Sequence, residues 1–247
     1  MRRCLIINAD DLGYDPAVDA GLLRAMRNGV VSSATLMVNT PFSTAAAEAA
    51  HGLAVGLHLN LARGRPVSPD FPGELLVNGA FAETGAEALP ARVVEAEARA
   101  QLKRAEQLLG CRPTHLDVHK HLHRTATVLA GAAAAAAAWG LPVRALDGTM
   151  RAALRAHGVA TSDDFVGEAG GEAYWTLPRF LAALEGLRPG TTELMCHPGE
   201  PPTHVQSGYA AQRRVELDTF TSPEARAALE RTGTVLLDFR ALHPTAP

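Results

Sequence analysis

The sequence predicts an α/β fold: a (β/α) barrel of the TIM-barrel-like type, closed or incomplete, with about seven strands. Short apolar runs alternate with longer stretches of helical periodicity from one end of the chain to the other. No glycine-rich phosphate fingerprint follows the first apolar run, which disfavours a dinucleotide-binding sheet. No linker or change in composition divides the chain, so residues 1–247 are expected to form one domain.

Hydrophobic patterns and punctuating residues define the expected elements. The expected strands are short runs rich in Leu, Ile and Val: Cys4–Asn8, Ala34–Val38, Val55–Leu59, Thr114–Val118, Val143–Ala145, Glu193–Cys196 and Val235–Phe239. The expected helices lie between them: Pro16–Asn28, Ser43–Ala50, Ala91–Leu109, Thr125–Trp139, Pro178–Leu187 and Pro223–Arg231. Pro16 and Pro223 stand near helix starts, and Gly29, Gly110 and Gly140 follow helical runs. The remaining long stretches are expected to be loops: residues 62–90, 160–175 and 198–213.

Composition argues against several classes of protein. The chain carries 23 basic and 26 acidic residues, a formal charge of −3 and no basic run, so no nucleic-acid partner is expected. No segment approaches the roughly 18 apolar residues of a membrane span, so no membrane partner is expected either. The three cysteines, Cys4, Cys111 and Cys196, are far apart and fit reduced thiols better than a disulfide framework. We therefore expect a cytoplasmic protein.

Two adjacent carboxylates, Asp10 and Asp11, follow the first apolar run directly. Like charges held side by side repel each other and raise one pKa, and a metal ion or a catalytic proton relieves this repulsion. The alternative is an ordinary turn in which Asp11 or Asp15 caps the next helix. On this pair alone, the two interpretations are equally good.

Further polar side chains recur where the expected strands end. His58 and Asn60 close the third strand, and His197 follows the sixth. In a (β/α) barrel, the carboxyl ends of the strands form the catalytic face. Asn60 alone also fits turn chemistry. Taken together, the strand ends favour a functional site at that face.

Residues 115–123 are the richest in chemistry, because His115, Asp117, His119, His121 and His123 recur at every second position. An extended chain would turn all five to one side. Alternate residues lie roughly 6.5–7 Å apart along a strand, so they do not all bind one ion. We therefore expect some of them to bind metal or act in catalysis, and the others to orient ligands or contact substrate.

An Asp and two His suit a divalent cation that keeps open positions for water and substrate. Mixed nitrogen and oxygen ligands suit zinc best and also accept magnesium, manganese or cobalt. Such an ion lowers the pKa of its bound water and polarises a carbonyl group. A second Asp can then accept a proton, and a histidine can protonate a leaving amine. The pattern predicts metal-dependent hydrolysis of an amide.

Five motifs, in order along the chain, resemble the YdjC-like carbohydrate deacetylases. They are Asn8–Gly13, Ser33–Asn39, Gly56–Leu59, His115–His123 and Met195–Gly199. Each motif is weak alone, but five in the family's order are specific, and the resemblance covers the chain from Met1 to Phe239. It implies a (β/α)-barrel fold, an acetylated amino-sugar or oligosaccharide substrate, and a possible homodimer.

The resemblance also implies roles for individual residues. Asp11, His58 and His119 would hold one divalent ion, Mg²⁺ or Zn²⁺, with Asp10 as catalytic base and His197 as general acid. Five more residues are expected to support the ligands or contact the sugar: Asp117, His121, His123, Asn60 and Arg144. For Arg144, a salt bridge facing a helix is an equal alternative.

Two positions depart from the family pattern. Leu12 stands where the family usually has Phe, and Lys120 stands where it often has His. Because neighbours alternate sides along a strand, Lys120 is expected to point away from the ligands.

Other functions remain open at this point. A second hydrolase interpretation keeps the metal but acts on another amide or a phosphoester, and non-haem iron oxygenase chemistry is a weaker alternative. A non-catalytic sugar-binding protein on the same scaffold would not need the full set of Asp10, Asp11, His58, His119 and His197.

Overall fold

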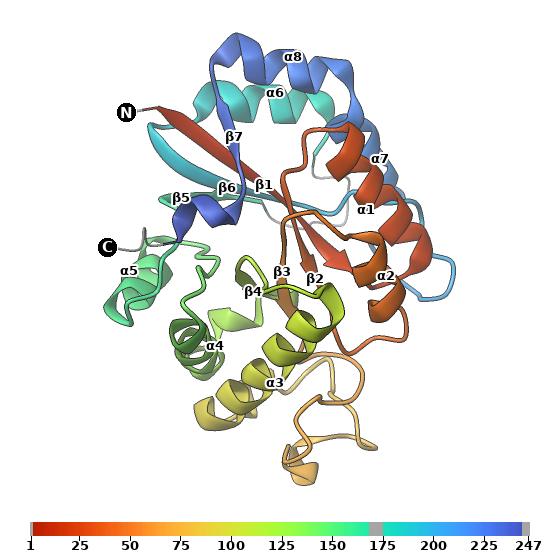
Figure 1. Cartoon of the computed structure of the whole chain (residues 1–247), viewed down its shortest axis with the longest axis vertical. Coiled ribbons are helices and arrows are strands. Elements are labelled where there is room, and N and C mark those ends of the chain that lie inside the picture. The colour runs from red at the N-terminus through yellow and green to blue at the C-terminus, as the bar shows by residue number, and fades with distance from the viewer. Residues whose placement is uncertain (1, 168–174, 244–247) are drawn as a thin grey trace.

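The computed structural model describes residues 2–167 and 175–243 (Figure 1). Part of the expected loop 160–175, namely residues 168–174, lies outside these ranges. The strands are β1 (Arg3–Leu12), β2 (Ser33–Leu36), β3 (Val55–Leu59), β4 (Leu116–Val118), β5 (Asp164–Val166), β6 (Gly190–Cys196) and β7 (Val235–Leu237). All paired strands are parallel.

The strands form one sheet in the order β4-β3-β2-β1-β6-β5, and β7 runs beside the first half of β1. Within the described residues, β4 and β5 are the two ends of this sheet and do not pair with each other. The sheet is therefore a half-barrel, a TIM-barrel-like fold that is incomplete. This confirms the α/β fold class and the incomplete form of the predicted barrel.

Helices surround the outside of the half-barrel (Figure 1). They are α1 (Pro16–Asn28), α2 (Ser43–Ala49), α3 (Ala91–Leu109), α4 (Ala126–Trp139), α5 (Gly148–Ala156), α6 (Leu177–Gly186), α7 (Ala211–Thr221) and α8 (Pro223–Thr232). Short 3₁₀ segments complete the chain: η1 (Gly73–Leu75), η2 (Ala86–Ala88), η3 (His119–Arg124) and η4 (Phe239–Leu242). None of the helices in the described part of the chain has the length and apolarity that a membrane span needs.

The core lies between the sheet and the helices. Leu5, Ile7 and Leu36 of the central strands are fully buried, as are Leu22 of α1 and Leu102 of α3. Burying such side chains contributes roughly 1.5–3 kcal/mol each, which anchors the helices against the sheet. The apolar spacing of these helices is thus explained by the main core that they cover.

Three of the expected elements were wrong. Val143–Ala145 is not a strand, because Val143 forms only a single bridge with Leu116. Strand β5 instead lies inside the expected loop 160–175 and is only three residues long. Helix α7 begins inside the expected loop 198–213, and its buried face includes polar side chains, Arg213 and Glu216 among them. A helix that buries polar residues lacks the apolar stripe by which it would be recognised. Helix α5 was not predicted from the sequence at all.

Candidate active site

The end of β1 is built to aim two carboxylates into a cavity. The strand runs on through Leu12, and its pairing with β2 becomes irregular between Ala9 and Leu12. Asp11 has φ 74°, in the left-handed region that few non-glycine residues adopt. Gly13 follows with φ 86°, and a Cβ there would lie 2.9 Å from the carbonyl oxygen of Met37. Asp10 and Asp11 both line a cavity of about 400 Å³.

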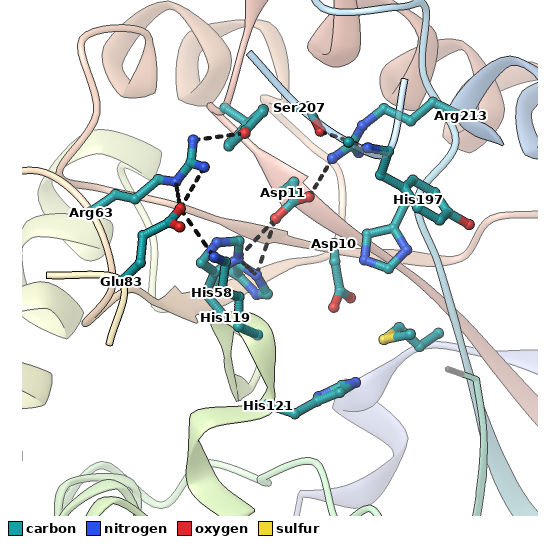
Figure 2. A pocket seen from close by; sticks show the side chains of 15 residues that line it. Asp10, Asp11, His58, Arg63, Glu83, His119, His121, His197, Ser207 and Arg213 are labelled. Carbon is teal, nitrogen blue, oxygen red and sulfur yellow. Dashed lines mark hydrogen bonds and ion pairs between the residues drawn. The ribbon is translucent and has the colours of Figure 1, made fainter. Parts of the chain in front are cut away.

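Three side chains from three separate segments meet at one point of this cavity (Figure 2). Asp11 Oδ1 lies 3.3 Å from His58 Nε2 and 3.2 Å from His119 Nδ1. The two histidine nitrogens are 3.1 Å apart. His58 belongs to β3, and His119 is the first residue after β4. The three atoms therefore form a nearly equilateral triangle.

This triangle has the spacing and chemistry of a divalent metal site. Donors about 2.0–2.2 Å from one ion, at angles between a right angle and the tetrahedral angle, lie roughly 3–3.5 Å apart. Asp11 Oδ1 is buried and has no hydrogen-bond partner among the described residues. Burial lowers the pKa of His58, but Asp117, Asp11 and Asp10 raise it by more, to about 10. The surrounding carboxylates thus favour a positive charge at this position, and the residues fit an ion.

Neighbouring groups orient two of the three candidate ligands, His58 and Asp11. Asp117 is the register partner of His58 on the adjacent strand, and its Oδ1 lies 2.6 Å from His58 Nδ1. A proton on Nδ1 leaves the lone pair of Nε2 free for a metal. Thr35 donates to Asp117 Oδ2 at 3.1 Å. Arg213 of α7 donates to the other oxygen of Asp11, at 2.6 Å. These neighbouring side chains therefore hold His58 and Asp11 in place.

Replacing Asp117 with Asn is expected to weaken metal affinity by about 10- to 100-fold, the usual effect of losing a carboxylate that supports a metal-binding histidine. A competition titration against a chromophoric chelator measures this change. Asp218→Asn, at an exposed position on α7, is the matched control and should leave the affinity unchanged. Equal affinities for wild type and Asp117→Asn would contradict the supporting role.

Arg144 lies in a second cluster of acidic groups, beside the triangle. Asp10, His58 and Asp117 also lie close enough to hold a cation, and the guanidinium of Arg144 is already there. It donates to the two oxygens of Asp10 at 2.6 and 2.7 Å and to Glu193 at 2.6 Å. Burial raises the pKa of Asp10, but Arg144 lowers it by more, so Asp10 stays ionised. Arg144 is fully buried and lies behind the carboxylates.

His197 lines the cavity beside Asp10, and side chains of the segment before α7 line it as well (Figure 2). Burial lowers the pKa of His197 to about 4, so its imidazole is neutral at pH 7. The ring packs against Tyr209, with 5.1 Å between ring centroids. Glu216 accepts hydrogen bonds from the backbone N–H of His197 and from the Tyr209 hydroxyl. Burial raises the pKa of Glu216 to about 7.

The extended geometry expected for residues 119–123 was wrong. Strand β4 ends at Val118, and Lys120 and His121 have φ 55° and φ 52° in a tight turn. Lys120 therefore does not point away from the cavity; it lines it and pairs with Glu83 at 3.1 Å. His121 lines the cavity as well. His123 is fully buried beside it, with 5.8 Å between the ring centroids.

Two other sequence candidates lie away from the triangle. His115 is buried and stacks on Phe239, with 3.6 Å between ring centroids. Asn60 does not line the cavity that contains the triangle of Asp11, His58 and His119, which is called the metal cavity below. Its amide donates to Asn39 and to the carbonyl of Arg63. The structure therefore brings together Asp10, Asp11, His58, His119, His121 and His197 around one cavity, with Asp117 and Arg144 behind them.

Several lining residues were missed by the sequence reasoning. They come from the loops and from α7: Tyr14, Arg63, Glu83, Tyr209 and Arg213. Isolated Arg and Tyr residues in loops carry no spacing signal, so only the fold reveals them.

Comparisons with known proteins identify the family of this chain. The family profile described as "YdjC-like protein" matches residues 4–231. A carbohydrate deacetylase of Geobacillus stearothermophilus is 37% identical over 251 residues, covering 98% of this chain and 99% of that protein. A chitooligosaccharide deacetylase of Serratia marcescens is 35% identical over 255 residues, covering 98% and 100%.

Solved structures agree as well. A crystal structure from Enterococcus faecalis V583, of a candidate cellobiose-phosphate cleavage protein, has a TM-score of 0.87 at 29% identity and covers 98% of this chain and 100% of that one. A lactam utilization protein of Thermus thermophilus has a TM-score of 0.58 at 20% identity, covers 94% of this chain and 98% of that one, and shares the fold. The family profile and these relatives, together with the five ordered motifs and the half-barrel, show that this chain belongs to the YdjC-like family.

Proposed function

We propose that this protein is a metal-dependent hydrolase that removes the N-acetyl group from an amino sugar or a short chitooligosaccharide and releases acetate. The observation that carries the proposal is the triangle of Asp11, His58 and His119, with atoms 3.1–3.3 Å apart in the wall of the cavity. The names of the relatives supply the substrate class, because they are carbohydrate and chitooligosaccharide deacetylases.

The reaction breaks the amide C–N bond, adds the oxygen of water to the acyl carbon and leaves a proton on the nitrogen. A divalent ion, when bound, supplies a Lewis acid that acidifies water and polarises the acetamide carbonyl. Asp10 takes the role of base, since it lines the cavity and remains ionised beside Arg144. Oδ2 of Asp10 accepts a hydrogen bond from Arg144, and a carboxylate oxygen with one such bond retains a lone pair for a proton.

His197 takes the role of general acid toward the departing amine. Its pKa of about 4 leaves it neutral at pH 7, so it must first receive the proton that the water loses. A base and an acid that line the same cavity permit this relay. The backbone bond of His197 to Glu216 and its contact with Tyr209 fix the position of the ring.

Acetate release from N,N′-diacetylchitobiose tests the proposal. Purified protein loaded with Zn²⁺ or Mg²⁺ is expected to release acetate, and chelation with EDTA is expected to abolish release until metal is restored. Mass spectrometry of the sugar product should show the loss of one acetyl group. Undiminished turnover after chelation would contradict metal dependence. No release from protein that holds one ion per chain would favour another amide or a phosphoester as substrate.

The cytoplasmic location and the homodimer expected from the sequence stay predictions. Sedimentation analysis of the purified protein tests the second of them directly.

A further inference from the structure

A second cavity, of about 240 Å³, adjoins the metal cavity and shares Tyr14 and Arg63 with it. It lies over the ends of β2 and β3 and is lined also by residues of the segment before α7. Independent small-molecule sites usually enclose about 300–1,000 Å³. The second cavity falls below that range, and its shared wall makes it an extension of the metal cavity.

Apolar and aromatic groups form most of its wall. Met37, Pro41, Phe42 and Val205 line it, and the Phe42 ring lies against the His204 ring with 5.4 Å between centroids. Hydrogen bonds fix part of this wall to the rest of the protein. The buried Asp15, which caps α1, accepts hydrogen bonds from the backbone N–H groups of Thr203 and His204. The cavity is therefore shaped before any ligand arrives.

The polar side chains of this cavity already have partners within the protein. The amide of Asn60 donates to Asn39 Oδ1, and Asn39 in turn donates to the carbonyls of Arg63 and Arg65. Thr40 donates to the carbonyl of Gly13. The cavity therefore offers an aromatic and aliphatic surface more than free hydrogen-bonding groups.

No group of potential metal ligands among the described residues lies in this second cavity. A second hydrolytic centre is thus not supported there. A pyranose ring has a face of C–H groups, which packs well on an aromatic ring while its hydroxyls stay at the solvent-facing rim. Arg63 and Tyr14, joined by a 2.9 Å hydrogen bond, mark the boundary between the two cavities.

We propose that the second cavity binds the sugar unit next to the one that is deacetylated, with the apolar face of that sugar against Phe42. The glycosidic linkage then passes over Tyr14 and Arg63, and the preferred substrate contains at least two linked amino sugars. Figure 2 shows Arg63 on the side of the metal cavity opposite His197, which leaves room for the substrate to extend in that direction. This inference rests on the deacetylase function proposed above.

The test compares N-acetylglucosamine with N,N′-diacetylchitobiose in the metal-loaded enzyme. The wild type should prefer the disaccharide in kcat/KM. Phe42→Ala should lower kcat/KM for the disaccharide by about tenfold, mainly through KM, and leave the monosaccharide within about twofold. Val77→Ala, at an exposed position outside both cavities, is the control and should change neither value. Since the two substrates are compared within one variant, a general loss of folded protein lowers both equally.

Calorimetric titration of the metal-free protein with both sugars gives a readout that does not need turnover. If the wild type binds the disaccharide more tightly than the monosaccharide, and Phe42→Ala loses this preference, the result supports sugar binding in the second cavity. This holds even if no acetate is released, and in that case only the proposed reaction is contradicted. Release that is equal for both sugar lengths, or lowered equally by Phe42→Ala, overturns the second cavity and leaves the reaction standing. A Phe42-dependent preference for N-butyrylglucosamine over N-acetylglucosamine would show an acyl chain there instead, and would also overturn it.

Discussion

Replacing His119 with Ala is expected to remove the bound metal and to lower kcat/KM for deacetylation by about a thousandfold or more. In the proposed metal site, His119 would supply one of three donor atoms, 3.1 Å and 3.2 Å from the other two. The two remaining ligands would hold a divalent ion poorly. A Lewis acid contributes several kcal/mol to such a transition state, and about 1.4 kcal/mol corresponds to a factor of ten in rate. Metal content by inductively coupled plasma mass spectrometry and acetate release are the two measurements.

The matched control for this variant is His51→Ala, at an exposed histidine that lines neither cavity. The control should retain one metal ion and full activity. Full metal occupancy in His119→Ala would rule out His119 as a ligand. Normal metal content with lost activity would instead assign this histidine to substrate binding.

Replacing Arg144 with Met is expected to cause the largest loss of stability, about 3–5 kcal/mol, because it leaves buried carboxylates without their cation. Arg144 is fully buried and lies within 3.0 Å of Asp10, Asp117 and Glu193. In a protein of this size, such a loss lowers Tm by roughly 6–20 °C. Thermal and urea unfolding of the metal-free protein measure it.

The control is Arg155→Met, because Arg155 forms an exposed pair with Asp163 and should contribute less than about 1 kcal/mol. The double variant Arg144→Met/Glu193→Gln removes one of the stranded carboxylates and should recover part of the loss. A Tm of Arg144→Met equal to that of the wild type would contradict this role, because it would show that water replaces the guanidinium at no cost.

The sequence predicted the parts of the site that follow strand ends and failed where the chain turns. The alternation of strands and helices led to the half-barrel, and the motifs led to Asp11, His58 and His119, which the fold brings together. The period-two spacing of residues 119–123 predicted an extended chain, and this prediction was wrong. Lys120 is not a usual turn-forming residue, and yet it has positive φ together with its neighbour His121. Their conformation depends on tertiary contacts that no local pattern records.

Arg213 shows a second limit of sequence reasoning. It lies on α7, a helix whose buried face mixes polar residues with the core residues Leu217 and Phe220, and its own side chain lines the cavity. An amphipathic pattern cannot reveal such a helix, and the contact of Arg213 with Asp11 joins residues that are 202 positions apart. The strand predicted at Val143–Ala145 was wrong for a different reason. A run of strand-like residues forms a strand only if it pairs with a neighbour along its length, and Val143 has only a single bridge.

The left-handed backbone of Asp11 limits how this site can change under mutation. Few residues other than Gly tolerate φ 74°, and Asn, Asp and His are the enriched exceptions. Of these, only Asp combines that backbone with a negatively charged oxygen ligand, so two independent requirements select one residue. His58, on a regular strand, carries no such backbone demand. A library aimed at a different metal preference therefore has far more freedom at His58 than at Asp11.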